Sequence, residues 1–402
     1  MSGVLSEALV IVFVPTGYAD ICPRNIQRLV CSIVRWHRLR ISLTLQCIVI
    51  VGVITASVGS VTFAVSCEVR QSSSTEPEIF RRHLIGTCTA EERERLAIHA
   101  DSLFKVLKEG KQVDLRGVMI VGDLMLDQLP LQPLSPATLP STSAQQVVAE
   151  RQIEEGRIIQ RSVSVHNAVI QGNWATNLRQ GLVIILGEFS VTGTRFEQSV
   201  DFSHTLFLQG LNFSNSEILY EGFFVRAHFE KPALFNKVLF GTHSRFHKAQ
   251  FKHDAHFIES RFTGLAEFLE VIFEQGADFT KVQFQMGTGF SGAQFTGPAI
   301  FSESLFIREA FFRFSRFEQD ADFQDATFQK ISDFTDSSFA AHTNFNNVEF
   351  LIPPQFSGTI FEGTGQGANK QKDVSEIISV ILVFLGFLCV LAWGLKKWRH
   401  SV

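Results

Sequence analysis

Residues 277–323 read ADFTKVQFQMGTGFSGAQFTGPAIFSESLFIREAFFRFSRFEQDADF, and phenylalanine returns in this stretch after alternating gaps of five and six residues. The same alternation continues without a slip from Phe196 to Phe361, where Ile218 is the single in-phase position that is not phenylalanine. Of the 40 phenylalanines in the 402-residue chain, 30 lie in this frame, whereas the whole chain has 2 Tyr and 4 Trp. A position that specifically selects phenylalanine therefore recurs through the middle of the chain.

The residue two positions before each phenylalanine is small or β-branched in nearly every unit, as in Ala277-Asp278-Phe279 and Ala321-Asp322-Phe323. Side chains two apart on a strand share a face, so the small residue and the Phe point inward and the residue between them points outward. The remaining residues of each unit turn a corner, and sides of 5 + 6 + 5 + 6 residues make a coil of 22. An eleven-residue helical repeat is disfavoured because Phe, Thr, Ser, Asp and Gly fill the region.

A coil of 22 residues places each phenylalanine over the phenylalanine one coil later, so columns of rings are expected in the core. Two columns form the predicted structural ladder. The first contains Phe224, Phe246, Phe268, Phe290, Phe312 and Phe334, and the second contains Phe235, Phe257, Phe279, Phe301, Phe323 and Phe345.

The small-x-Phe-x-x unit resembles the pentapeptide-repeat proteins in their Phe-centred form, over residues 196–361. The resemblance implies a right-handed quadrilateral parallel β-helix whose interior is filled by the small residue and the Phe. Every second unit carries an extra residue, such as His243 or Asp254, which departs from the strict family pattern and leaves the turn types open. The expected fold class is mainly β: a parallel β-helix of 22 residues per coil, a capping α-helix and two transmembrane α-helices.

The regular β-helix is assigned to residues 191–361, and degenerate coils to residues 112–190. A Pro-rich insertion at 127–150 interrupts the degenerate coils. The 5/6 spacing, extended backward, meets Val191, Ile185, Gln180, Trp174, Val169, Val163 and Ile158, of which six are apolar.

The segment 68–111 is expected to be a linker followed by a helix over residues 90–109. Thr89 and Glu92 have the spacing of a capping box, and Leu96, Ala100, Leu103 and Leu107 share a helical face. An amphipathic helix is expected here because the open end of a β-helix exposes unpaired backbone and apolar rings.

Two uncharged segments, 41–67 and 377–395, are long enough to be transmembrane helices. Basic residues flank both segments on their outer sides: Arg24, Arg28, Arg35, Arg38 and Arg40 precede the first, and Lys396, Lys397 and Arg399 follow the second. The positive-inside rule therefore predicts a cytoplasmic N-terminal segment 1–40, a cytoplasmic tail 396–402 and an extracytoplasmic β-helix joined to the second span by the linker 362–376. The expected location is a bacterial membrane. Cleavage of the first span as a signal after Ala64-Val65-Ser66 is the alternative.

No arrangement of residues in the sequence indicates a cofactor, a metal site or a catalytic site. His243, His247, His253 and His256 fall on different sides of the predicted coil, so they are not expected to converge on a metal ion. The acidic residues Glu318, Asp320, Asp322 and Asp325 are likewise spread over two sides, and a solvated surface is favoured over a calcium site. Cys67 and Cys88 both lie on the extracytoplasmic side, where a disulfide is permitted.

Three classes of function remain for such a chain. The favoured hypothesis is a non-enzymatic scaffold at the membrane that binds an unidentified protein partner, with the lipid bilayer as its other contact and neither nucleic acid nor a small-molecule substrate. Some pentapeptide-repeat proteins mimic DNA and protect topoisomerases, and residues 261–361 are acidic, with 13 Asp plus Glu against 6 Lys plus Arg, a net charge of −7. The third hypothesis is a polysaccharide-acting β-helix enzyme, which requires positioned carboxylates in a groove.

Overall fold

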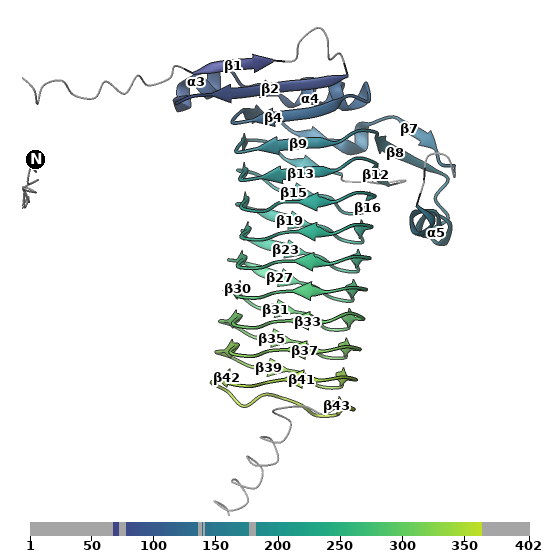
Figure 1. Cartoon of the computed structure of the whole chain (residues 1–402), viewed down its shortest axis with the longest axis vertical. Coiled ribbons are helices and arrows are strands. Elements are labelled where there is room, and N and C mark those ends of the chain that lie inside the picture. The colour runs from purple at the N-terminus through teal and green to yellow at the C-terminus, as the bar shows by residue number, and fades with distance from the viewer. Residues whose placement is uncertain (1–66, 72–77, 136–138, 140, 177–181, 364–402) are drawn as a thin grey trace, which may run out of the picture. The chain divides into compact units, whose positions relative to one another are not determined.

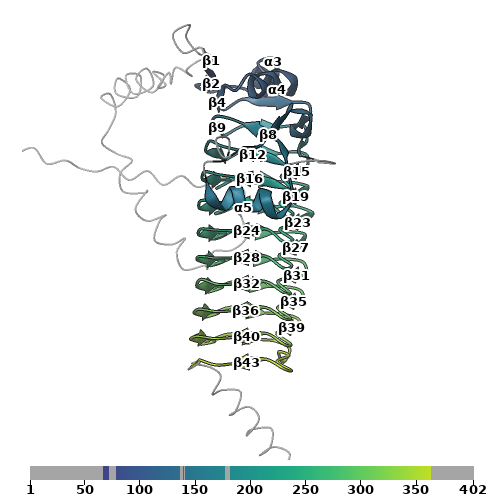
Figure 2. The same ribbon diagram turned by 90° about the vertical axis from the view of Figure 1, so that its right-hand side faces the viewer.

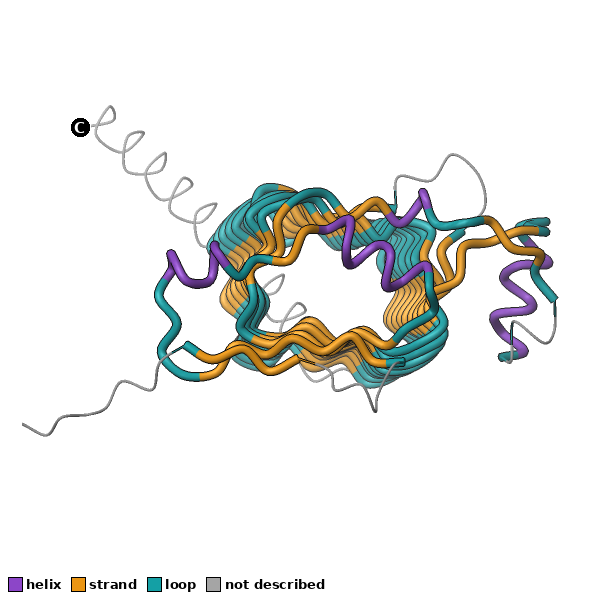
Figure 3. The backbone as a smooth tube through the Cα atoms, turned by 90° about the horizontal axis from the view of Figure 1, so that it is seen from above, coloured by secondary structure: helices purple, strands orange, loops and turns teal. Residues whose placement is uncertain are grey.

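The computed structural model describes residues 67–71, 78–135, 139, 141–176 and 182–363. In these residues the chain winds into stacked coils whose strands form four sheets, with 12, 11, 9 and 11 strands. All strand pairs are parallel except β1 with β2 and β7 with β8. Figure 1 shows the coils stacked one below the other, and Figure 3 shows the four sides from above.

The four sheets are named here as sides A to D, in the order in which the chain passes through them. Side A contains β1 (Glu68–Gln71), β2 (Ile79–Ile85), β4 (Gln112–Arg116), β9 (Val163–His166), β13 (Phe189–Thr192), β17 (Leu211–Asn212), β21 (Ala233–Leu234), β25 (Ala255–His256), β29 (Ala277–Asp278), β33 (Ala299–Ile300), β37 (Ala321–Asp322) and β41 (Thr343–Asn344). Side B contains β3 (Ile98–His99), β5 (Met119–Val121), β10 (Val169–Ile170), β14 (Arg195–Phe196), β18 (Glu217–Ile218), β22 (Leu239–Phe240), β26 (Arg261–Phe262), β30 (Gln283–Phe284), β34 (Leu305–Phe306), β38 (Thr327–Phe328) and β42 (Glu349–Phe350).

The other two sides complete each coil. Side C contains β6 (Leu124–Met125), β11 (Trp174–Ala175), β15 (Val200–Asp201), β19 (Glu221–Phe223), β23 (His243–Arg245), β27 (Leu265–Glu267), β31 (Thr288–Gly289), β35 (Ala310–Phe311) and β39 (Ser332–Asp333). Side D contains β7 (Leu131–Pro133), β8 (Glu155–Ile159), β12 (Val183–Ile185), β16 (Thr205–Phe207), β20 (His228–Phe229), β24 (Gln250–Phe251), β28 (Ile272–Phe273), β32 (Gln294–Phe295), β36 (Arg316–Phe317), β40 (Ser338–Phe339) and β43 (Ile360–Phe361).

The core is built from the repeat, as the sequence predicts. Phenylalanines 22 residues apart stack nearly parallel, as in Phe246 and Phe268, whose ring centroids lie 4.8 Å apart at 2°. Rings from sides A and C meet edge to face across the interior, as in Phe279 and Phe290 at 5.3 Å and 86°. Both geometries are favourable for aromatic pairs, and small residues such as Ala277 leave room for the rings.

The alternating five- and six-residue spacing reflects two kinds of corner. Each five-residue corner passes through a residue with positive φ, such as Lys281 at 57° and Phe314 at 57°. The Lys281 N–H donates to the carbonyl of Ser302 in the next coil at 2.9 Å, so the inter-coil hydrogen bonds continue through the turn. In the six-residue corners, the extra residue makes the turn in place of a residue with positive φ. The extra residues therefore loosen alternate corners without interrupting the ladder.

The backward extension of the 5/6 spacing is correct at Val191 and Ile185 but wrong at the five earlier positions, from Gln180 to Ile158. Gln180 itself lies outside the described residues. The register pairs Ile170 with Phe196, Val165 with Val191 and Ile159 with Ile185, and it brings Thr176 level with Phe202. The in-phase residues are therefore Thr176, Ile170, Val165 and Ile159 rather than Trp174, Val169, Val163 and Ile158. The cause is a side of nine residues between positions 176 and 185, four longer than the repeat.

The predicted helix over 90–109 is two helices, α3 (Ala90–Arg95) and α4 (Ala100–Lys108). The capping box of Thr89 and Glu92 is present at the start of α3. The short strand β3 separates the helices because Ile98 enters the coil and pairs with Ile120. Leu103 and Leu107 of α4 are buried in the main core, and Figure 3 shows the helix at the rim of the first coils.

Among the helices of the described residues, none has the length and apolar character that crossing a bilayer requires. Both predicted transmembrane segments, 377–395 and 41–67 except for Cys67, lie outside the described residues. Their assignment stays a prediction.

Candidate interaction site

One segment of the chain leaves the regular coils in the described residues and returns to them. After the 3-10 turn η1 (Leu126–Gln128) it forms the strand β7, the helix α5 (Thr142–Glu150) and the strand β8, which pairs antiparallel with β7. The predicted Pro-rich insertion corresponds to this excursion. Figure 2 shows α5 in front of the strands of side D.

The excursion forms where side D is apolar on both of its faces. Ile159 and Ile185 point into the main core, while their neighbours Ile158 and Ile184 point outward and are also buried. Leu206 and Leu208 continue this outward apolar surface in the next coil. Helix α5 covers it with Ala144 and Val148, which form a second small core outside the β-helix. Burial of these outward side chains holds α5 against side D.

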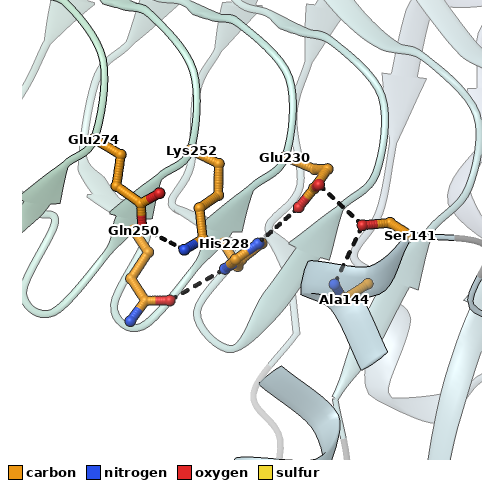
Figure 4. A network of polar contacts seen from close by, with 7 residues as sticks. All are labelled: Ser141, Ala144, His228, Glu230, Gln250, Lys252 and Glu274. Atoms are coloured by element: carbon orange, nitrogen blue, oxygen red, sulfur yellow. Dashed lines mark hydrogen bonds and ion pairs between the residues drawn. The ribbon is translucent and has the colours of Figure 1, made fainter. Parts of the chain in front are cut away.

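The covered part of side D ends at a polar network (Figure 4). The Ser141 hydroxyl caps α5 by accepting from the Ala144 N–H at 3.2 Å, and it donates to Glu230 Oε1 at 2.9 Å. The other oxygen of Glu230 lies 3.1 Å from His228 Nε2, and His228 Nδ1 lies 3.2 Å from Gln250 Oε1. The network therefore joins the N-terminus of α5 to two successive coils.

His228 is an outward-facing residue that is nevertheless 1 % exposed. Burial lowers the pKa of His228 because it penalises the imidazolium, and the nearby Lys252 acts in the same direction. The hydrogen bonds to Glu230 and Gln250, together with the charge of Glu230, oppose this shift. Lys252 is itself paired with Glu274, one coil further along side D (Figure 4).

Two clefts flank α5. The first, of about 610 Å³, lies between the helix and the segment before it, and Leu134, Leu139 and Val148 are among its lining residues. The second, of about 560 Å³, lies beside the N-terminus of α5 and has Leu208 in its lining and Glu230 and Lys231 among its polar groups. The apolar residues of the first cleft, with a few polar groups beside them, are typical of a site that binds another molecule, whereas the second cleft is lined mainly by polar side chains. The sequence did not reveal these clefts, because the excursion's packing depends on the outward residues of three coils.

The predicted ladder residues lie in the core. Eleven of the twelve are fully buried, and Phe345, in one of the last coils described, is partly buried. The first column belongs to side C and the second to side A. These residues are structural and bring no chemistry to the surface.

Cys67 and Cys88 are joined by a disulfide in the structure. The bond ties the residue at the end of the predicted first span to the segment that precedes the capping helices. The sequence left this pairing open.

The histidine and acidic groups singled out in the sequence do not converge. His243 and His247 lie on side C, His253 at a corner of side D and His256 on side A, and Glu318 lies on side D while the three aspartates lie on side A. Asp322 accepts hydrogen bonds from Gln324 N–H at 2.9 Å and from Asn344 Nδ2 at 2.9 Å. The part of the chain that the structure describes contains no group of three or more His, Cys, Asp or Glu side chains placed to hold a metal ion.

Comparison with known proteins places the repeat in a family. Residues 246–338 match a family model described as pentapeptide repeats (9 copies), in alignments over 246–293, 257–305, 279–327 and 290–338. No curated protein and no solved structure matches the chain. The matched residues form the most regular coils, in which phenylalanine and a small residue alternate in the core. The coils of residues 246–338 are therefore pentapeptide repeats.

Proposed function

We propose that this chain is a non-enzymatic scaffold, anchored in a membrane, that binds a protein partner on side D beside helix α5. Pentapeptide-repeat β-solenoids are in general structural or interaction proteins rather than enzymes. The observation that carries the proposal is the excursion around α5, which forms two clefts beside side D, the first with Leu134, Leu139, Val148 and Ile153 in its lining and the second with mainly polar groups. Together the two clefts offer apolar contact area and polar groups, which suits recognition of a protein segment.

Membrane anchoring is the part of the proposal that rests on the sequence. The segments 41–67 and 377–395 are uncharged over the length that a bilayer requires, and basic residues flank each on its outer side. In this arrangement the β-helix is tethered from both ends on the non-cytoplasmic side. A partner on side D is then held close to the membrane surface.

Photocrosslinking in the native membrane tests the partner site. A photoreactive amino acid replaces the exposed Gln209, which lines the second cleft, and as a control it replaces the exposed Gln294 on the same side but away from α5. We expect a discrete protein adduct from position 209 and none from position 294. Equal adducts at both positions, or none at 209, would contradict a partner site beside α5.

The DNA-mimic hypothesis is the second candidate, and the outward residues of side A favour it. Asp278 and Asp322 face outward on this side with Ile300 in the coil between them, and Glu259, Glu303 and Asp325 lie at its corners with Lys281 among them. Imitation of a phosphate backbone requires an array of carboxylates, which side A provides in part. This function needs side A to face the cytoplasm, so it is exclusive with the predicted orientation.

A further inference from the structure

We infer that two copies of this chain associate through side C, with their solenoids antiparallel. The inference goes beyond the proposed partner site, which lies on side D. It rests on the outward residues of two successive coils on side C. One coil presents a groove of small residues, and the next presents a ridge of large ones.

The groove consists of Gly287, Gly289, Ser291 and Gly292, which are all the outward residues of one coil on this side. The walls of the groove are Leu265 and Leu269 in the coil before and Phe311 and Arg313 in the coil after, and they enclose about 270 Å³. The ridge consists of Glu309, Phe311, Arg313 and Phe314. Phe311 and Phe314 are 38 % and 57 % exposed, whereas the inward phenylalanines beside them, Phe306, Phe312 and Phe317, are buried.

The backbone does not require glycine at positions 287 and 292. Gly292 has a φ of 71°, but the equivalent corner residues of the flanking coils are Glu270 at 54° and Phe314 at 57°. A Cβ on Gly287 would meet only ordinary contacts, the nearest being Leu265 Cδ1 at 3.5 Å. Glycine in a strand loses more conformational freedom on folding than other residues do. A Cβ on Gly289 would meet Leu269 Cδ2 at 2.9 Å, so the packing of Leu269 accounts for that glycine, whereas the fold of the chain itself does not explain Gly287.

The ridge and the groove are one coil apart, which makes side C self-complementary. A two-fold axis that lies along the strand direction, between the two coils, brings each groove opposite the ridge of the other copy. Phe311 then faces Gly289 and Phe314 faces Gly292, in both directions, as an isologous interface requires. The alternative axis, parallel to the solenoid, sets ridge against ridge and groove against groove, so the shape selects antiparallel solenoids.

The flanking apolar residues agree with the same arrangement. The axis sets Asp333 opposite Glu267 of the second copy, and each of these carboxylates is already paired within its own chain, Asp333 with Arg313 at 3.5 Å and Glu267 with Arg245 at 2.7 Å. The ridge itself carries one positive and one negative side chain, so the two copies do not repel through it. Leu265 and Ile331, 41 % and 37 % exposed, face each other on either side of the axis.

The mass of the full chain, extracted in detergent and measured by light scattering, tests the association. We expect twice the chain mass of 45.0 kDa for the wild type. Gly287→Glu fills the groove and sets a carboxylate opposite Glu309 of the second copy, so its mass should fall by half. Gln294→Glu makes the same change of charge on side D and should leave the dimer intact. Phe311→Ser, which removes part of the ridge, is a second variant with the same expected loss.

Crosslinking between two differently tagged copies tests the antiparallel geometry. One copy carries Leu265→Cys and the other Ile331→Cys, and the four cysteines other than Cys67 and Cys88 are replaced by Ser in both. A short bismaleimide should join these two copies and should not join two copies that both carry Leu265→Cys. A monomeric wild type, a dimer that survives both Gly287→Glu and Phe311→Ser, or a dominant crosslink between identical positions would each overturn the inference.

Discussion

Most in-phase phenylalanines are held by two kinds of contact, a stacked ring one coil away and an edge-to-face ring from another side. Phe290 shows both, with Phe268 and Phe312 stacked at 4.7 and 5.0 Å and Phe279 and Phe301 edge to face at 5.3 Å each. Tyrosine does not replace it, because a buried hydroxyl would need a hydrogen-bond partner that the ring column does not offer. The strong bias for phenylalanine follows from these contacts.

Phe290→Ala should lower the free energy of unfolding by about 3–5 kcal/mol, because it removes a fully buried ring from the middle of the ladder. Gln294→Ala, at an exposed position of the same coil, should change it by less than about 0.5 kcal/mol. Denaturant unfolding of the full chain in detergent, followed by the β-sheet circular dichroism signal, measures both. Similar losses for the two variants would show that the assignment of inward and outward positions is wrong.

His228 should make stability depend on pH. Its pKa in the folded chain lies below the unfolded value of 6.5, so below pH 6.5 the unfolded chain binds more protons. Stability should therefore fall as the pH drops from 6.5 toward the folded pKa. Burial also lowers the pKa of His166 and His204, so part of the slope belongs to them.

His228→Gln separates the contribution of His228 from that of the other two histidines. Unfolding midpoints of this variant and of the wild type are compared at pH 7.5 and 5.5. The variant should lose less stability between the two values than the wild type does. An identical loss in both would assign the pH dependence elsewhere.

The elements differ in how far the sequence predicts them. The strands of residues 196–361 were predictable because one residue type recurs at a spacing that allows only one register. The interruption of the capping helix was not, because Ile98 leaves the helical path to pair with Ile120, and such a pairing is a tertiary contact. The frame before Ile185 failed because Trp174 and Val163 are apolar at the second inward position of their strands, so hydrophobicity alone did not reveal the shift.

The candidate site was less predictable than the fold. The Pro-rich composition of the insertion indicated that the chain leaves the coil, but not that it returns as a helix on side D. The position of α5 depends on Ile184, Leu206 and Leu208, which are outward residues separated from the helix by more than thirty positions. Ser141 and Glu230 are 89 residues apart, so their hydrogen bond has no local signature.

Ser141→Ala should loosen helix α5 without weakening the coils. The change removes the N-cap bond to Ala144 and the contact with Glu230, and loss of an N-cap costs about 0.5–2 kcal/mol. Amide hydrogen exchange should accelerate over residues 142–150 and stay unchanged over the strands of residues 246–338. Equal acceleration in both regions would mean that α5 and the coils unfold as one unit.

For the membrane anchoring that we propose, the decisive question is which side of the membrane carries the solenoid, because the scaffold and the DNA mimic require opposite answers. The disulfide between Cys67 and Cys88 agrees with an oxidising compartment, where such bonds persist. The carboxylates of side A would serve a DNA mimic only in the cytoplasm. The positive-inside rule predicts the opposite location for them.

A single cysteine at an exposed position of side A decides between the two. Gln324→Cys, in a chain whose six native cysteines are replaced, should react with a membrane-impermeant maleimide added from the non-cytoplasmic side of intact membranes. The matched control is a cysteine in the basic segment 1–40, which should react only after permeabilisation, because its arginines hold it in the cytoplasm. If the cysteine in segment 1–40 reacts in intact membranes and the cysteine at position 324 reacts only after permeabilisation, the acidic coils lie in the cytoplasm. The DNA-mimic function would then replace the scaffold, because the carboxylates of side A would be free to meet a DNA-binding protein.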